Sequence, residues 1–146
     1  MTTTQFRSAL AAAAFSAALV TAMPASAEML MYKADLKGSA EVPATDSKAT
    51  GVVDATYDTT AKKLSWTITS VGLTGAATAA HFHGPAEAGK NAAPVLPING
   101  NLVSPIKGDA TLTDAQAADL QAGKWYFNVH TAAHKDGEIR GQVMKK

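Results

Sequence analysis

Residues 64–69 read Leu-Ser-Trp-Thr-Ile-Thr, and this stretch decides the fold class. Its apolar side chains occupy every second position, which is the period of a strand with one buried face. Residues 52–57 alternate in the same way, and the polar link 58–63 makes the two stretches a predicted hairpin. Residues 29–36 alternate as well. These segments predict an antiparallel sheet.

Further short strands are expected at residues 76–83, 125–130 and 138–144. Asn99-Gly100, between residues 95–98 and 102–106, is typical of a two-residue hairpin turn. Pro97 and Pro105 would place that hairpin at a sheet edge, because proline has no N–H to donate to a ladder.

One short helix is expected at residues 114–122. Thr113 and Gln116 have the spacing of a capping box, and Gly123 can take the left-handed conformation that ends a helix. Many short strands separated by turns, with a single helix, predict an all-β fold, an antiparallel Greek-key sandwich or barrel.

The first 27 residues have the features of a cleaved secretory signal peptide. Arg7 precedes an apolar, alanine-rich stretch, and Ala25-Ser26-Ala27 has the small-residue pattern of a cleavage site. We therefore expect a periplasmic or secreted protein with one domain at residues 28–146 and no membrane span after cleavage. The chain has no cysteine, which excludes disulfides and thiolate metal sites.

The charge is nearly balanced, with 13 Lys and Arg against 12 Asp and Glu, so a nucleic-acid partner is not expected. The chain also lacks a phosphate-binding glycine loop and the G-x-S-x-G pattern of a serine hydrolase. Nucleotide and hydrolase chemistry have little support.

All four histidines fall into two tight pairs, His81 with His83 and His130 with His134. Residues two apart on a strand point to the same face about 6.5–7 Å apart, so His81 and His83 suit two imidazoles converging on one ion. His130 shares the polar face of its strand with Asn128 and lies at the strand end. These residues predict a metal site.

The alternative is a polar strand face whose histidines bond to water or backbone. His134 lies in a turn, where it either closes the site or is solvated. Imidazole ligands without thiolate favour copper, with zinc as the second choice. Met29 and Met31 would either add thioethers suited to copper(I) or fill gaps at a frayed terminus.

Arg140 is the only arginine after the signal segment, which suggests a need for its planar, two-pronged group. A structural ion pair with Glu41, Glu138 or Asp136 is one interpretation, and guidance of an anion towards a metal is the other. Arg140, Glu138, Glu41 and Asn128 are thus candidates to support the histidines.

The chain resembles the CHRD domain of chordin, which is also common in exported bacterial proteins. The similarity rests on Leu-Lys-Gly-Ser-Ala-Glu-Val-Pro at 36–43, Ala-His-Phe-His-Gly-Pro-Ala at 80–86, Gly-Lys-Trp-Tyr-Phe-Asn-Val-His-Thr at 123–131 and Gly-Glu-Ile-Arg-Gly-Gln-Val at 137–143. The resemblance implies an antiparallel β fold over nearly all of residues 28–146 and implies little about biochemistry.

A looser similarity exists to Cu/Zn superoxide dismutase, which also uses H-x-H on a strand of a Greek-key barrel to bind copper. Two functions follow. The first is an exported protein that binds copper or zinc, for storage, buffering or, if it is an enzyme, redox chemistry like that of superoxide dismutase. The second is a structural or binding module whose partner is an extracellular protein or an envelope polymer.

Overall fold

The structure is a computed structural model that describes residues 26–146. The signal segment expected at residues 1–27 therefore lies outside the described residues, apart from its last two. Among residues 26–146, no helix is long and apolar enough to cross a membrane.

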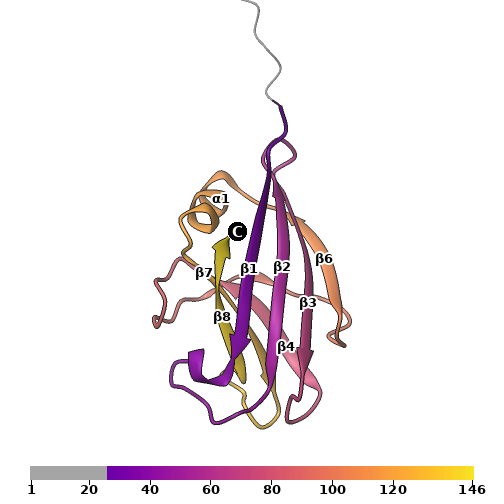
Figure 1. Cartoon of the computed structure of the whole chain (residues 1–146), viewed down its shortest axis with the longest axis vertical. Helices are drawn as coiled ribbons and strands as arrows, with labels where there is room; N and C mark the ends of the chain where they lie inside the picture. The colour runs from indigo at the N-terminus through magenta and orange to yellow at the C-terminus, as the bar shows by residue number, and fades with distance from the viewer. Residues whose placement is uncertain (1–25) are drawn as a thin grey trace, which may run out of the picture.

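In the described part of the chain, residues 26–146, eight strands form one antiparallel sheet in the order β5-β4-β7-β8-β1-β2-β3-β6 (Figure 1). Their bounds are β1 (Met29–Lys37), β2 (Thr50–Asp58), β3 (Lys63–Val71), β4 (Ala77–His83), β5 (Pro94–Pro97), β6 (Ile106–Thr111), β7 (Trp125–Thr131) and β8 (Ile139–Lys145). A short 3-10 turn, η1 (Gly38–Ala40), follows β1. The all-β prediction is confirmed, and the predicted hairpin is β2 and β3, paired from Thr50 opposite Val71 to Asp58 opposite Lys63.

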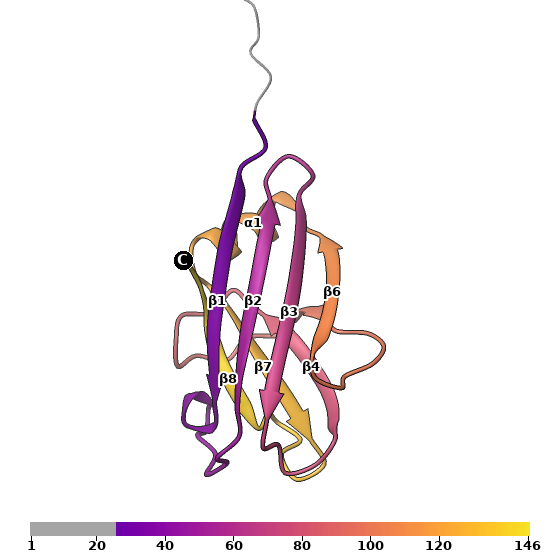
Figure 2. The same cartoon turned by 45° about the vertical axis from the view of Figure 1, so that its right-hand side comes forward.

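The sheet curls so that its two halves pack against each other. Phe82 of β4 meets Trp66 of β3 edge to face, with ring centroids 5.5 Å apart, although four strands separate β4 from β3 within the sheet. Figure 2 shows β1, β2, β3 and β6 in front of the layer made by β4, β7 and β8. The core between the layers is built from alternate residues, including the fully buried Tyr32, Leu64 and Phe127.

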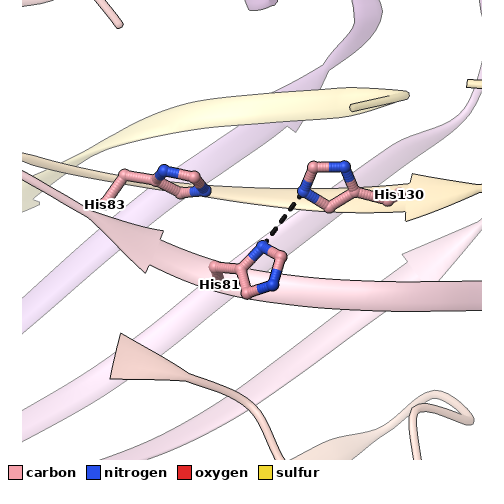
Figure 3. A group of neighbouring side chains, drawn as sticks. All are labelled: His81, His83 and His130. Carbon is pink, nitrogen blue, oxygen red and sulfur yellow. Dashed lines mark hydrogen bonds between the residues drawn. The ribbon is translucent and has the colours of Figure 1, made fainter. Parts of the chain in front are cut away.

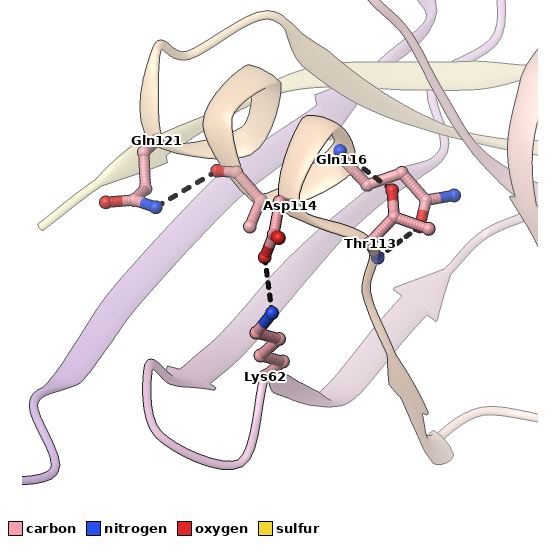
Figure 4. Close-up of polar contacts among 6 residues, drawn as sticks. Lys62, Thr113, Asp114, Gln116 and Gln121 are labelled. Carbon is pink, nitrogen blue, oxygen red and sulfur yellow. Dashed lines mark hydrogen bonds and ion pairs between the residues drawn. The ribbon is translucent and has the colours of Figure 1, made fainter.

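The one α-helix of residues 26–146, α1 (Asp114–Gln121), begins at the predicted residue and ends one residue before the predicted end, with Ala122 as its C-cap. Thr113 Oγ1 accepts a hydrogen bond from the Gln116 N–H at 3.2 Å, and Gln116 Oε1 accepts one from the Thr113 N–H at 2.9 Å (Figure 4). Gly123 takes a positive φ of 70° directly after the helix. Lys62 contacts Asp114 at 2.6 Å, which ties the helix to the β2–β3 turn.

The prediction of a hairpin around Asn99-Gly100 is wrong. β5 pairs with β4 and β6 pairs with β3, so the two segments lie at opposite edges of the sheet. Residues 102–105 do not form a strand; Asn101 Oδ1 accepts from the Val103 N–H at 2.9 Å in a local turn. Pro105 has no N–H to donate to a ladder, and β6 begins only after it, at Ile106, and pairs with the longer strand β3 as far as Thr111. The expected edge position is confirmed for the segment ending at Pro97, which forms the edge strand β5, but not for residues 102–105.

Candidate metal centre

Alternation on two neighbouring strands brings three histidines together. β4 carries His81 and His83, and β7 carries His130, with Ala79 of β4 directly opposite His130. Phe82 points into the core because it lies between the two histidines on the strand. The three imidazoles gather on the other face of the sheet, where they point towards one another (Figure 3).

The cluster is compact. One ring nitrogen from each of the three imidazoles lies within 4.8 Å of the others, and His81 Nδ1 is 3.1 Å from His130 Nε2. Three nitrogen ligands at about 2 Å from one tetrahedral ion lie about 3.3 Å apart. A contraction of about 1.5 Å at most would bring the three nitrogens to that separation.

Two of the imidazoles are held in a fixed tautomer by backbone carbonyls. His83 Nδ1 lies 2.9 Å from the Ala92 oxygen, and His130 Nδ1 lies 2.8 Å from the Lys135 oxygen. A carbonyl only accepts, so each Nδ1 carries the hydrogen and each neutral ring presents a bare Nε2 lone pair. This is the arrangement in which proteins orient metal-binding histidines.

Burial favours the neutral form of two of the rings. It lowers the pKa of His81, with further lowering from the neighbouring His130 and His83 rings. Burial also lowers the pKa of His83, against the raising effect of its bonds to Ala92 and Asn128. Neutral imidazole is the form that binds a metal.

The Asn128 amide lies between two of these lone pairs. Its Oδ1 is 2.9 Å from His83 Nε2 and 3.0 Å from His130 Nε2, and the side chain is buried. Asn128 is thus one of the supporting residues expected from the sequence, and it contacts two members of the cluster directly.

A stack of three side chains supports His83 from the side. The Tyr126 ring lies parallel to the His83 ring at 4.6 Å, and the Arg140 guanidinium lies 3.4 Å from the Tyr126 centroid. Arg140 also donates to Asn91 Oδ1 at 2.8 Å and to the Lys90 carbonyl, which holds the loop between β4 and β5 over the sheet. Burial lowers the pKa of Arg140.

Arg140 does not make the ion pair considered from the sequence. Within residues 26–146 it forms no salt bridge with Glu41, Glu138 or Asp136. Its donors serve loop residues that carry no negative charge. Tyr126 was not among the functional residues expected from the sequence, although strand alternation puts it on the same face as Asn128 and His130.

Glu41 lines a cavity beside the cluster. This cavity of about 350 Å³ is also lined by His83, Asn128 and Asp136. Glu41 is 6% exposed, and its Oε1 is buried without a hydrogen-bond partner. Burial raises its pKa to about 7, against the lowering effects of Arg140 and of the Asn128 amide. Gly137, with φ of 128°, lies so close to this carboxyl that a Cβ would overlap it.

Glu138 lies apart from the histidine cluster, in a separate group of buried polar side chains. It is fully buried and accepts four hydrogen bonds from neutral donors: Ser47 Oγ at 2.7 Å, the Thr74 N–H at 2.9 Å, Thr74 Oγ1 at 2.8 Å and Thr131 Oγ1 at 2.7 Å. Burial raises the pKa of Glu138, but these hydrogen bonds outweigh it and lower the pKa to about 2. Its position indicates a structural role that joins three chain segments.

His134 is not part of the histidine cluster. The group that brings the ring nitrogens together contains His81, His83 and His130. The backbone of His134 closes a turn, in which its N–H donates to the Thr131 carbonyl at 3.1 Å. The structure therefore brings together three of the four histidines considered from the sequence.

Comparison with known families fits this architecture. The fold and site define an antiparallel β domain with a histidine cluster on the outer face of two neighbouring strands. A family model of the CHRD domain matches residues 32–143. The chain belongs to the CHRD-domain family. No significant match was found among curated proteins or among solved structures.

Proposed function

We propose that this CHRD-domain protein binds one transition-metal ion through His81, His83 and His130. The observation that carries the proposal is the convergence of three ring nitrogens. In two of the rings the Nδ1–H groups donate to the Ala92 and Lys135 carbonyls, which leaves Nε2 free. Their free Nε2 atoms converge with a nitrogen of His81 within 4.8 Å. Bonds to backbone alone would also fit a polar strand face, whereas three ring nitrogens facing one another favour a bound cation.

Copper is the metal we propose first, and zinc second. Nitrogen ligands without thiolate suit copper(II) and zinc, whereas calcium and magnesium prefer oxygen ligands. Three protein ligands leave a coordination position open, which storage and buffering tolerate and redox catalysis requires. We propose a binding role in the periplasm or outside the cell, with reaction of superoxide as the activity to examine if copper is bound.

Expression of the full chain tests this proposal. The purified product is weighed by mass spectrometry, which also tests cleavage after Ala27, and is then titrated with copper(II) under electron spin resonance. We expect one equivalent of copper with nitrogen hyperfine structure, lost in His83→Ala and kept in the control His134→Ala. Equal, weak binding by all three proteins would exclude the site.

A binding module remains the second candidate. It is supported by a cavity of about 460 Å³ at the edge of the sheet, lined in part by Leu73, Leu102 and Val103. Val103 is 71% exposed, so this face presents apolar surface to solvent. A stoichiometric extracellular or envelope partner that binds the double variant His81→Ala, His83→Ala unchanged would favour this function.

A further inference from the structure

The contact between Asn128 and the two imidazoles presents a mismatch of hydrogen-bonding groups. His83 Nε2 and His130 Nε2 carry lone pairs, because the hydrogens of both rings are on Nδ1. Asn128 Oδ1, at 2.9 and 3.0 Å from them, is an acceptor too. Three buried acceptors facing one another are unfavourable unless a cation or a donor lies between them.

Rotation of the Asn128 amide by 180° removes the mismatch while no metal is bound. Nδ2 then replaces Oδ1 and donates one hydrogen to His83 Nε2 and the other to His130 Nε2. Both rings keep their bonds to the Ala92 and Lys135 carbonyls. The lone pairs of His83 Nε2 and His130 Nε2 then both face a donor.

The other end of the amide faces Glu41. A Cβ built on Gly137 would lie 2.7 Å from Asn128 Nδ2 and closer still to Glu41 Oε1, so these two atoms lie near each other beside Gly137. An amide oxygen turned towards Glu41 needs a protonated carboxyl as donor, whereas an amide nitrogen needs an ionised carboxylate as acceptor. The protonation of Glu41 and the orientation of Asn128 are therefore coupled.

We infer that Asn128 is a positioning residue that links metal loading to the release of one proton from Glu41. Before loading, its Nδ2 caps the two Nε2 lone pairs and Glu41 O–H donates to its Oδ1. On loading, the metal takes both lone pairs, the amide turns, Nδ2 donates to the Glu41 carboxylate, and the proton leaves to solvent. The inference rests on the proposed metal site.

Several charged groups act on Glu41. Arg140 on β8 favours the carboxylate, and Asp136, in the turn before β8, lines the same cavity. His134 and Lys135 line an adjoining cavity of about 210 Å³ together with Glu41. Burial is the largest influence and raises the pKa of Glu41 to about 7, so the carboxyl carries a proton below neutral pH and can lose it on loading.

The test is a count of released protons. Zinc chloride is titrated calorimetrically into the full protein and into Glu41→Gln, in buffers of different ionisation enthalpy, at about pH 6 and about pH 8. Protons released by the imidazoles are common to both proteins and cancel. Because a carboxyl of pKa about 7 is mostly protonated only at the lower pH, the wild type should release about one more proton at pH 6 and none more at pH 8.

Affinity gives a second expected result. Below pH 7 the zinc affinity of the wild type should fall about tenfold more per pH unit than that of Glu41→Gln, because one additional proton is released. In proteins that also carry Asn128→Ala, the pH dependence of the zinc affinity should be the same whether residue 41 is Glu or Gln. The exposed control Glu87→Gln should behave as the wild type.

Carbon NMR of the Glu41 carboxyl tests the inference on the wild type alone, so it does not depend on whether a variant folds. The Glu41 carboxyl resonance at pH 6 should move from its protonated to its ionised position when zinc is added. Zinc binding with an unmoved Glu41 resonance, or equal proton release by wild type and Glu41→Gln, would overturn the inference and leave the metal site intact. Absence of zinc and copper binding would remove the proposed function as well.

Discussion

Replacement of Glu138 by glutamine should destabilise the protein strongly although it changes only one atom. The carboxylate accepts hydrogen bonds from Ser47, Thr74 and Thr131, and Thr74 donates twice, through its N–H and its hydroxyl. A glutamine amide offers one acceptor oxygen. Its nitrogen would face two groups that now act as donors.

The magnitude follows from the four hydrogen bonds. A bond to a charged group contributes about 1.5–3 kcal/mol and a neutral one about 0.5–1.5 kcal/mol, so each exchange costs about 1 kcal/mol. The hydroxyls can rotate to accept from the new amide, whereas the Thr74 N–H cannot. We therefore expect a loss of about 2–4 kcal/mol in the free energy of unfolding and a fall of roughly 10 °C in Tm.

Urea unfolding followed by tryptophan fluorescence measures this loss, since Trp66 and Trp125 are buried. Glu87→Gln is the matched control, because Glu87 is 76% exposed and lies 4.0 Å from Lys124. A loss below about 0.5 kcal/mol in Glu138→Gln, equal to that expected of a surface change, would refute the reasoning.

The same carboxylate predicts a pH dependence. Its pKa is about 2 in the folded protein and 4.5 ordinarily, so its contribution is complete above pH 4.5. The contribution is lost as the pH falls from 4.5 towards 2, because the unfolded chain then binds a proton that the folded one does not. The advantage of the wild type over Glu138→Gln should shrink over this range and stay constant above it.

Two further changes are predicted. Gly137→Ala should lower the free energy of unfolding by about 2–4 kcal/mol, because its Cβ would overlap the buried Glu41 carboxyl. The control Gly89→Ala should lower it by about 1 kcal/mol, from its positive φ alone. Thermal melts compare the two variants, and equal losses would contradict the overlap. Arg140→Lys should weaken the attachment of the loop between β4 and β5 to the sheet by about 1.5–3 kcal/mol, because an ammonium cannot make both loop bonds and stack on Tyr126. Hydrogen exchange at the Ala92 amide, which donates to Tyr126, should then become faster. Unchanged protection of this amide would exclude the role of Arg140.

Much of the fold could be predicted from local patterns. The period of two in residues 64–69 and the capping box at Thr113 are determined by neighbours in the chain, and both are confirmed. The partner of each edge strand is not determined locally. Asn99-Gly100 has the residues of a hairpin turn, but pairing across the sheet separated the strands on either side of it.

The site shows the same division. Alternation alone places His81 and His83 on one face and His130 beside Asn128. The carbonyls of Ala92 and Lys135 that hold two of the rings come from loops, and every residue type has a carbonyl. No side-chain pattern could reveal them. The partners of Arg140 escaped prediction for the same reason, since one of them is the backbone of Lys90.

The position of β1 has a consequence for how the chain is made. β1 lies between β2 and β8, so the first of the eight strands along the chain finds its second partner only in the last of them. The registers run from Lys37 opposite Arg140 to Tyr32 opposite Lys145. Until those residues emerge, β1 and β7 both have an open edge in the middle of the sheet, and open edges invite pairing between chains. A chain without β8 would therefore keep two open edges and be prone to aggregate rather than form a smaller domain.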